Sequence, residues 1–339
     1  MQVMAGAPVG GAEAFFERLV VGLQKRPIKQ RVVLRSYDDR VRRLRNAGLE
    51  PTILKFGGFF DVSTRYKLER LVDQDRPQIV LTWMNRATAA CPIPTPKRRF
   101  VFVARLGGYY NLKYYRRCDH LVANTHGIRR YLIEQGWAPD RVHYLPNFVD
   151  APRASHEPAQ SSEQGMRRIF AAGRLHENKG FDVLIRALSL IDDAYLEIAG
   201  VGPLERSLRA LAEEVGVADR VRWLGWVETP VDHCQAAEVF VCASRHEPLG
   251  NVIVEAWAAG CPVVATSAQG PTELISDGVD GRLVPIDDHV GLAEAIKEVL
   301  SQQSFAQAIA AAGRRRFLES FTEEAVVDQY MRFFEEITP

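Results

Sequence analysis

Two glutamates, Glu247 and Glu255, lie where the sequence changes from a strand pattern to a helix pattern. An apolar run at 239–243 precedes a polar turn, and an amphipathic stretch then leads to a second apolar run at 262–265. This order predicts a strand, a helix and a parallel strand. Ligands of such sheets lie beyond the carboxyl ends of strands, where a helix N-terminus favours an anion. Two carboxylates there do not suit a phosphate alone, so they indicate a ligand that also carries hydroxyl groups, such as a nucleoside diphosphate sugar.

Cations and glycines follow other predicted strands. Arg174 and Lys179 come after the apolar run at 168–172, where a pair of cations suits a diphosphate leaving group. Gly10 and Gly11 precede a predicted helix, so the backbone there can approach a phosphate closely. Each feature also has a plain structural explanation: a surface Arg and Lys near a helix start, and a tight turn.

Two more segments are candidates for the nucleotide. Gly202 belongs to a second glycine loop after the predicted strand at 195–199, and Val227 ends a stretch whose backbone groups could contact a nucleobase. The only D-x-D sequence, Asp73 and Asp75, is expected to be a helix end rather than a metal site. We therefore expect neither a metal nor another cofactor beside the co-substrate.

The composition is that of a globular protein of about two domains, with 339 residues, 47% hydrophobic and 25% charged. There is no run of 18 apolar residues and no basic and apolar leader at residues 1–13. The five cysteines are widely spaced and lack a C-x-x-C pairing, which favours reduced thiols and a cytoplasmic protein.

The charge is unevenly distributed. Residues 1–150 hold 26 Lys and Arg against 13 Asp and Glu, whereas the remainder holds 17 against 29. The first half is therefore a candidate for peripheral contact with an anionic membrane or for a phosphorylated acceptor. Solvated helix faces without a partner explain the arginines equally well. Nucleic acid is not expected, because no nucleic-acid-binding motif accompanies the charge. The basic clusters are Arg40, Arg42, Arg43 and Arg45; Lys97, Arg98 and Arg99; and Arg116, Arg117, Arg129 and Arg130.

Alternating strand and helix patterns predict two doubly wound α/β domains with parallel sheets. The first domain is expected at 1–150 and the second at 167–320. The segment 151–166 has almost no large apolar side chains and is expected to be a linker. A last helix within 321–339 has an apolar stripe and could pack on either domain, including back on the first.

Motifs along the chain resemble those of the retaining, nucleotide-sugar-dependent glycosyltransferases with the GT-B fold and an E-x7-E motif. Residues 168–285 carry GRLHENKGFDVLIRAL, LEIAGVGP, VRWLGWV and EPLGNVIVEAWAAGCPVVATSAQGPTELISDGVDGRLV. The first half carries GGAE and NTHGIRRYLIEQGWAPDRVHYLPNFVD. ARLGGYYNLKYYRRCDHLVANT together with EPLGNVIVEAWA is similar to enzymes of lipopolysaccharide-core or envelope-glycan assembly. The resemblance implies two Rossmann-like domains facing across a cleft, and transfer of a sugar to a glycan or lipid-linked acceptor.

The resemblance also implies roles for individual residues. Glu247 would contact the donor sugar near the reacting carbon, and Glu255 would hold the ribose, whereas without the other motifs both would be first-turn acids stabilising a helix dipole. Arg174 and Lys179 would clamp the diphosphate, and Gly11 would face it from the other domain. The remaining donor-binding positions implied are Gly10, Leu249, Gly250 and Asn251. Same-face transfer with retention of anomeric configuration, without a metal, is the implied mechanism.

The sequence departs from the family at one point. Many relatives have a histidine after the strand that ends near Ala104, where this chain has Arg105 and, further on, Tyr109. Either residue could substitute for the histidine, and Arg105 is the candidate because it follows the predicted strand beside a glycine pair. His126 is expected to be an ordinary polar residue at a helix start. A GT-B-fold epimerase or phosphorylase, or a non-catalytic partner protein of the same fold, is the alternative to a glycosyltransferase.

Overall fold

The computed structural model describes residues 1–8, 10–58, 61–152 and 165–338. They form two compact units, each with its own sheet and core. Unit 1 comprises Met1–Asn147 and Glu323–Pro339, and unit 2 comprises Phe148–Thr322. Most of the segment that we expected to be a linker, 153–164, lies outside the described residues. Because the last helix belongs to unit 1, the first domain is built from two separate stretches of the chain.

Unit 1 contains a seven-stranded sheet in the order β3-β2-β1-β4-β5-β6-β7, and its paired strands are parallel. The order reverses between β1 and β4, which makes this point the switch point of the sheet. The strands are β1 (Gln2–Met4), β2 (Val32–Arg35), β3 (Thr52–Leu54), β4 (Ile79–Trp83), β5 (Val101–Leu106), β6 (His120–Ala123) and β7 (Val142–Tyr144).

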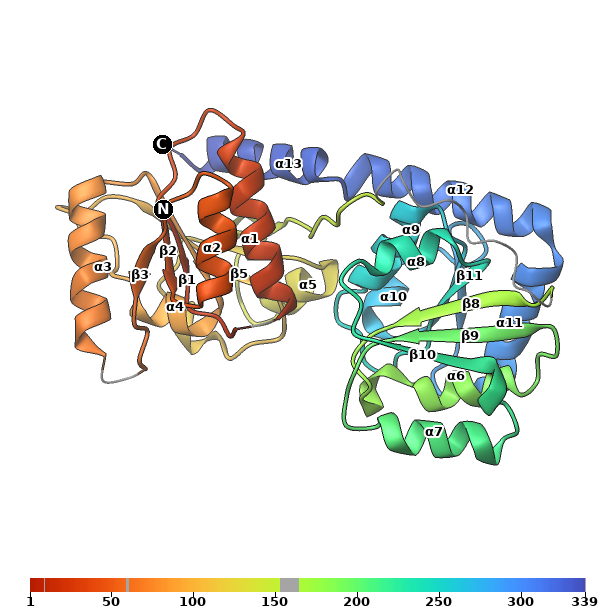
Figure 1. The fold of residues 1–339 in the computed structure, drawn as a ribbon. Helices are drawn as coiled ribbons and strands as arrows, with labels where there is room; N and C mark the ends of the chain where they lie inside the picture. The colour runs from red at the N-terminus through yellow and green to blue at the C-terminus, as the bar shows by residue number, and fades with distance from the viewer. Residues whose placement is uncertain (9, 59–60, 153–164, 339) are drawn as a thin grey trace. The chain divides into compact units, whose positions relative to one another are not determined.

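Helices connect the strands of unit 1, and the last helix packs beside the first (Figure 1). A Cβ on Gly22 would lie 2.8 Å from a Val327 methyl, so glycine lets these two helices approach closely. Lys25 pairs with Glu323 at 2.5 Å in the same contact. The helices are α1 (Gly11–Gln24), α2 (Asp38–Asn46), α3 (Val62–Asp75), α4 (Met84–Ala90), η1 (Leu112–Tyr114), α5 (His126–Glu134), η2 (Pro139–Arg141) and α13 (Glu323–Ile337).

Unit 2 contains a six-stranded sheet in the order β10-β9-β8-β11-β12-β13, again with parallel pairs. Its order reverses between β8 and β11. The strands are β8 (Arg167–Ala172), β9 (Ala194–Ala199), β10 (Val221–Gly225), β11 (Val239–Cys242), β12 (Val263–Thr266) and β13 (Arg282–Val284). The two parallel doubly wound sheets confirm the predicted fold class.

Both faces of the unit 2 sheet are covered, because its strands are apolar on both sides. Ile169 and Ala171 face a cluster with α6, α7 and α11, whereas Phe170 between them faces a cluster with α8 and α9. No helix among the described residues is long and apolar enough to cross a membrane. The helices are η3 (Glu177–Lys179), α6 (Phe181–Leu188), α7 (Glu205–Glu214), η4 (Ala218–Arg220), α8 (Pro230–Gln235), α9 (Asn251–Ala259), α10 (Gln269–Leu274), α11 (His289–Ser301) and α12 (Gln303–Ser320).

Candidate functional site

The switch point of the unit 2 sheet brings together residues that follow two neighbouring strands. Arg174 and Lys179 follow β8, and Glu247 follows β11, which pairs with β8. Because both strands are parallel, their carboxyl ends open onto the same edge of the sheet. The sequence prediction that these residues share one site is therefore compatible with the topology of this unit.

Glu247 is a buried carboxylate with two partners. Lys179 Nζ donates a hydrogen bond to its Oε2, and the backbone N–H of Gly250 donates to its Oε1 at 3.2 Å. Its side chain is only 10% exposed and that of Lys179 is 24% exposed. Removing a carboxylate from water is costly unless it is paired, so the hydrogen bond from Lys179 offsets the cost of burying Glu247 and orients it. Lys179, which we assigned to the diphosphate, thus also binds the catalytic candidate.

Glycines fix the backbone that makes this pair possible. Gly180 has a φ of 60°, and a Cβ there would lie 2.0 Å from the carbonyl oxygen of Ala243, at the end of β11. Gly250 has a φ of 71° and precedes α9. A side chain at Gly180 would push the loop of Lys179 away from β11, and thus away from Glu247. The pair depends on a backbone contact that only glycine permits.

Arg174 is the exposed cation of this edge. It directly follows Gly173, at the end of β8, and makes no ion pair or hydrogen bond with the described residues. Its guanidinium is therefore available to an external anion, which matches the role that the sequence implied for it. Lys179 forms an ion pair with Glu247, whereas Arg174 has no carboxylate partner among the described residues.

The remaining predicted donor contacts lie on the same sheet edge or on α9. Leu249 and Asn251 flank Gly250, and Glu255 lies one turn into α9, half-buried. Gly202 follows β9, where a Cβ would lie 2.3 Å from the carbonyl oxygen of Leu175. Packing of the two loops thus explains the glycine without a ligand. Val227 follows β10 and packs partly against the α9 side of the core. Their contacts with a donor remain predictions.

In unit 1 the glycine loop after β1 covers a buried acid, Glu13. Glu13 is 7% exposed and accepts a hydrogen bond from the backbone N–H of Ala7 at 2.7 Å. A Cβ on Gly10 would lie 2.2 Å from its Oε2, whereas a Cβ on Gly11 would meet no described atom within 4 Å. Gly10 is therefore needed for packing, and Gly11 faces open space. The sequence motifs predict no role for Glu13; an acid just inside a helix that begins with glycine is the signal that could have indicated one.

Arg105 does not present its guanidinium to a substrate. It is 1% exposed, donates to the Tyr330 hydroxyl at 2.9 Å and to Asn147 Oδ1 at 2.5 Å, and lies 4.6 Å from each of the Phe15 and Trp83 rings. It lies within β5 and not after the strand as expected, and its side chain points into the core and joins α13 to the sheet. The hypothesis that Arg105 replaces the family's histidine is therefore not supported.

The other two residues considered for that place lie near the surface. Tyr109 is 40% exposed and makes an edge contact with Tyr131, at a centroid distance of 5.2 Å. His126 is the first residue of α5 and stacks on Tyr144 at 3.8 Å, in agreement with an ordinary residue at a helix start. Of the candidates after β5, Tyr109 is thus the exposed one.

The D-x-D sequence forms ion pairs at the end of α3, as expected of a helix end. Asp73 binds Arg98 at 2.6 Å, and Asp75 binds Arg31 at 2.7 Å. No group of three His, Cys, Asp or Glu side chains in the described ranges could hold a metal ion. The five cysteines are free and buried, and burial, aided by Glu247, raises the pKa of the Cys242 thiol to about 11. Cys242, the cysteine that precedes the site, is thus a neutral thiol.

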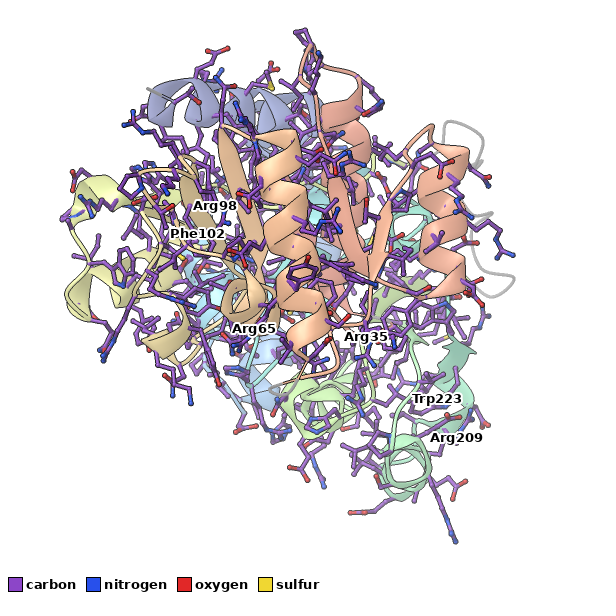
Figure 2. All side chains as sticks on the ribbon, turned by 90° about the vertical axis from the view of Figure 1, so that its left-hand side faces the viewer. Arg35, Arg65, Arg98, Phe102, Arg209 and Trp223 are labelled. Atoms are coloured by element: carbon purple, nitrogen blue, oxygen red, sulfur yellow. The ribbon has the colours of Figure 1, made fainter. Side chains whose placement is uncertain are left out.

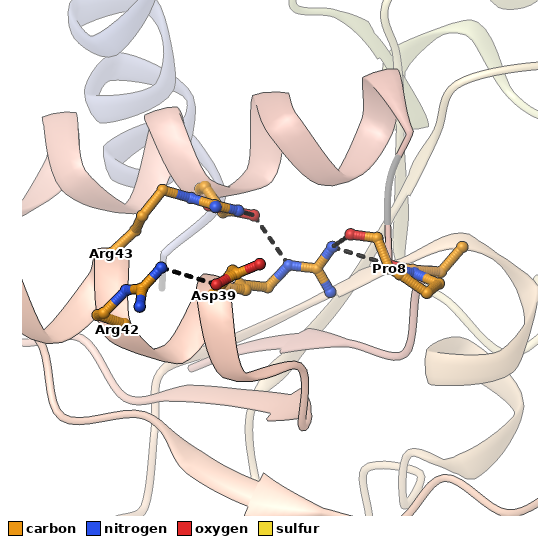
Figure 3. A network of polar contacts seen from close by, with 7 residues as sticks. Pro8, Asp39, Arg42 and Arg43 are labelled. Atoms are coloured by element: carbon orange, nitrogen blue, oxygen red, sulfur yellow. Dashed lines mark hydrogen bonds and ion pairs between the residues drawn. The ribbon is translucent and has the colours of Figure 1, made fainter.

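Most of the basic cluster on α2 is neutralised within unit 1 (Figure 3). Arg40 is 1% exposed and donates to Glu17 and to the carbonyl oxygens of Ala7 and Pro8. Arg43 also binds Glu17, at 2.7 Å. These ion pairs favour the structural explanation for Arg40 and Arg43, and Arg40 holds the chain just before the glycine loop.

Comparisons with known proteins identify the class of enzyme. Residues 166–302 match the family model described as Glycosyl transferases group 1, and residues 9–153 match Glycosyltransferase Family 4. The chain is 32% identical over 337 residues to the lipopolysaccharide core biosynthesis glycosyltransferase LpsE of Rhizobium meliloti (strain 1021), covering 95% of both chains. The chain therefore belongs to this glycosyltransferase family, and it is an enzyme of that class.

Two solved structures share the fold. A glycosyltransferase from Rickettsia africae ESF-5 has a TM-score of 0.86 at 18% identity, over 99% of this chain and 97% of that one. HepE of Anabaena, in complex with UDP and glucose, has a TM-score of 0.81 at 19% identity, over 99% of this chain and 100% of that one. These neighbours establish the GT-B architecture of the chain, as the sequence predicted.

Proposed function

We propose that the enzyme transfers a sugar from a UDP-sugar to a lipopolysaccharide-core or related envelope-glycan acceptor, with retention of the anomeric configuration. The Lys179–Glu247 pair beside the unpaired Arg174 is the observation that carries the proposal. The likeness to LpsE, a lipopolysaccharide core enzyme, supports the acceptor class, and the UDP and glucose bound to HepE support the donor.

In the proposed reaction the charges of unit 2 act on opposite ends of the breaking bond. Glu247 stabilises positive charge on the sugar, and Arg174 binds the diphosphate as negative charge grows on it. Lys179 orients Glu247 and adds positive charge on the phosphate side. Glu255 accepts hydrogen bonds from the ribose hydroxyls, and the backbone of Leu249, Gly250 and Asn251 contributes N–H donors. We propose that no metal or other cofactor takes part.

Donor identity can be tested by binding and turnover together. UDP should raise the melting temperature of the protein more than GDP or ADP, because a ligand of the native state stabilises it in proportion to its affinity. Incubation of UDP-sugars with envelope-glycan acceptors should release UDP. Glu255→Gln should weaken UDP binding about tenfold with little change in kcat at saturating donor. Equal stabilisation by all three nucleotides, or a kcat effect alone, would contradict these assignments.

We also propose that the enzyme acts in the cytoplasm, at the inner face of the membrane, where unit 1 contacts anionic lipids. Arg116 and Arg117 support this, since both are exposed and neither makes an ion pair with the described residues. Sedimentation with anionic and neutral vesicles tests it. Binding should be stronger to the anionic vesicles and should weaken with salt; equal binding to both would remove the proposal.

A further inference from the structure

A hollow of about 350 Å³ lies in unit 1, away from the residues assigned above. Its lining combines aromatic, cationic and amide side chains: Phe56, Asp61, Arg65, Asn85, Arg86 and Tyr114. These residues come from the segments after β3, β4 and β5. They therefore lie at the carboxyl edge of the sheet, the same edge that carries the Gly10–Gly11 loop after β1.

Two arginines that line the hollow have no polar partner within the part of the chain that the structure describes. Arg65 and Arg86 are exposed, and neither makes an ion pair or hydrogen bond with any residue that the structure describes. Arg98, which binds the other end of the same helix, α3, is instead paired with Glu69 and Asp73 (Figure 2). The contrast indicates that the charge of Arg65 is not used to hold the fold.

Asp61, the acid among the described residues that line the hollow, already accepts hydrogen bonds from neighbouring groups. Asp61 Oδ2 accepts hydrogen bonds from the Gly57 N–H and the Thr64 hydroxyl, and its Oδ1 accepts one from the Thr64 N–H. These bonds lower the pKa of Asp61 to about 2. The carboxylate therefore caps α3 and binds the backbone N–H of Gly57, and one acid against two arginines leaves the described lining positively charged.

The backbone around the hollow is strained at two positions. Phe56 has a φ of 47° and Met84, next to Asn85, has a φ of 61°, both in the left-handed region that side chains disfavour. Phe56 is buried, and its N–H donates to the Thr64 hydroxyl at 3.1 Å. Such strain persists only where surrounding contacts impose it, and it is typical of ligand sites.

Neutral groups suited to a sugar line the same space. The Tyr115 hydroxyl donates to Asn85 Oδ1 at 2.5 Å, which fixes the amide and leaves its N–H₂ group without a partner among the described residues. Tyr114 contributes a half-buried ring. A sugar with hydroxyls toward Asn85, its apolar face toward Tyr114 and an anionic group toward the arginines matches this lining.

We propose that this hollow binds an oxyanion, a phosphate monoester or a carboxylate, carried by a sugar residue of the acceptor, through Arg65 and Arg86. The proposal rests on the proposed function, because it assigns the hollow to the acceptor of that transfer. It makes Arg65 and Arg86 specificity residues: they select acceptors that carry negative charge.

Binding of three simple sugars to the full chain tests the proposal. Glucose 6-phosphate, glucuronate and neutral methyl glucoside serve as probes, with affinities measured by calorimetry or ligand-observed NMR. At least one anionic sugar should bind about tenfold more tightly than methyl glucoside. Arg65→Ala and Arg86→Ala should each lower the affinity for that anionic sugar about tenfold. Comparison of the affinities for glucose 6-phosphate and glucuronate shows whether the hollow prefers a phosphate or a carboxylate.

Arg70→Ala is the matched control, since Arg70 is an exposed arginine of α3 that does not line the hollow. It should leave the affinity for the anionic sugars unchanged. Equal binding of all three probes, or an equal loss in Arg70→Ala and Arg65→Ala, would overturn the proposal. Stabilisation by UDP, measured on every variant, separates the proposed function from the proposed acceptor subsite. A wild-type protein that UDP does not stabilise contradicts the proposed function. A protein that binds UDP but does not prefer anionic sugars contradicts only the acceptor subsite.

Discussion

The two sheets use arginines near their strand ends in opposite ways. In unit 2 the strand ends present a paired Lys179 and Glu247 and an unpaired Arg174. In unit 1 Arg105, near the carboxyl end of β5, is enclosed by aromatic rings and bound to Tyr330. Both arginines lie near the carboxyl end of a parallel strand, so the position along the sheet does not decide their role.

The elements packed around each strand end explain the difference. Arg105 meets α1 and α13, which cover it, whereas Arg174 follows a glycine loop that leaves it exposed. Unit 1 therefore uses Arg105 for stability, and its glycine loop covers the buried Glu13. In the proposed reaction, unit 2 supplies the charges.

Glu247→Gln should give the largest effect and is the strongest test of unit 2 as the charged half. The amide keeps the size of the side chain but removes the charge that stabilises the sugar, so kcat should fall about 10²–10³-fold. UDP affinity should change little, as measured by steady-state kinetics and calorimetry. Glu205→Gln, on the surface of α7, is the control. Full turnover by the Glu247 variant would end its assignment as a catalytic residue.

Arg105→Met and Arg174→Ala should separate stability from catalysis. Arg105→Met removes the donor to the buried Tyr330 hydroxyl and the hydrogen bond to Asn147, so the free energy of unfolding in urea should fall by about 3 kcal/mol. Turnover per folded molecule should stay near wild type. Arg174→Ala should change stability by less than about 0.5 kcal/mol but lower turnover. A stable Arg105 variant without activity would restore the sugar contact that the sequence suggested.

Substitution of the two glycines in the unit 1 loop should also separate stability from catalysis, with smaller effects than the arginine variants. Gly10→Ala places a Cβ against Glu13 and should destabilise the protein by about 1–3 kcal/mol. Gly11→Ala meets no described atom, so its stability should be unchanged while transfer falls about tenfold, if this backbone faces the donor. Thermal unfolding and initial rates measure both. Normal transfer by Gly11→Ala would remove Gly11 from the site.

The smallest expected effect is on the pH dependence of unit 1. His120 and His143 share a hydrogen bond of 3.0 Å beside Phe333, and burial lowers the pKa of both below 6.5. The unfolded chain then binds more protons as the pH falls through 6.5, so stability is lost in that range. The melting temperature should drop from about pH 7.5 to about pH 5.5, and less so in His143→Phe. His289→Asn, in unit 2, should keep the wild-type drop; an equal drop in His143→Phe would exclude this histidine pair as the cause.

The sequence predicted the sheets well where strands are long and apolar. All four residues of β11 are buried, and the strand–helix–strand order around Glu247 is confirmed. Strands were not predicted at β1, β3 and β13, which have three residues each. The side-chain contacts in the interior of unit 1 could not be predicted from the sequence. Burial of Arg105 depends on Tyr330, from the far end of the chain, and no local pattern reports that contact.

The geometry of the site was likewise only partly predictable. The residue types of Lys179 and Glu247 indicated a charged site, but their pairing depends on the close approach of Gly180 to Ala243. That approach is a property of two loops that are distant in sequence. The fold also decides which side chains meet at the hollow. Asp61 therefore caps a helix, whereas Arg65 and Arg86 have no ion-pair partner among the described residues.

The placement of α13 has a consequence for biosynthesis. The ribosome makes all of unit 2 after most of unit 1 and before α13, so unit 2 can close its core while unit 1 still lacks its last helix. Until then the guanidinium of Arg105 has no Tyr330 hydroxyl to bind, and the surface of α1 around Gly22 is uncovered. The order of completion in the nascent chain is therefore expected to be the reverse of the order of the domains.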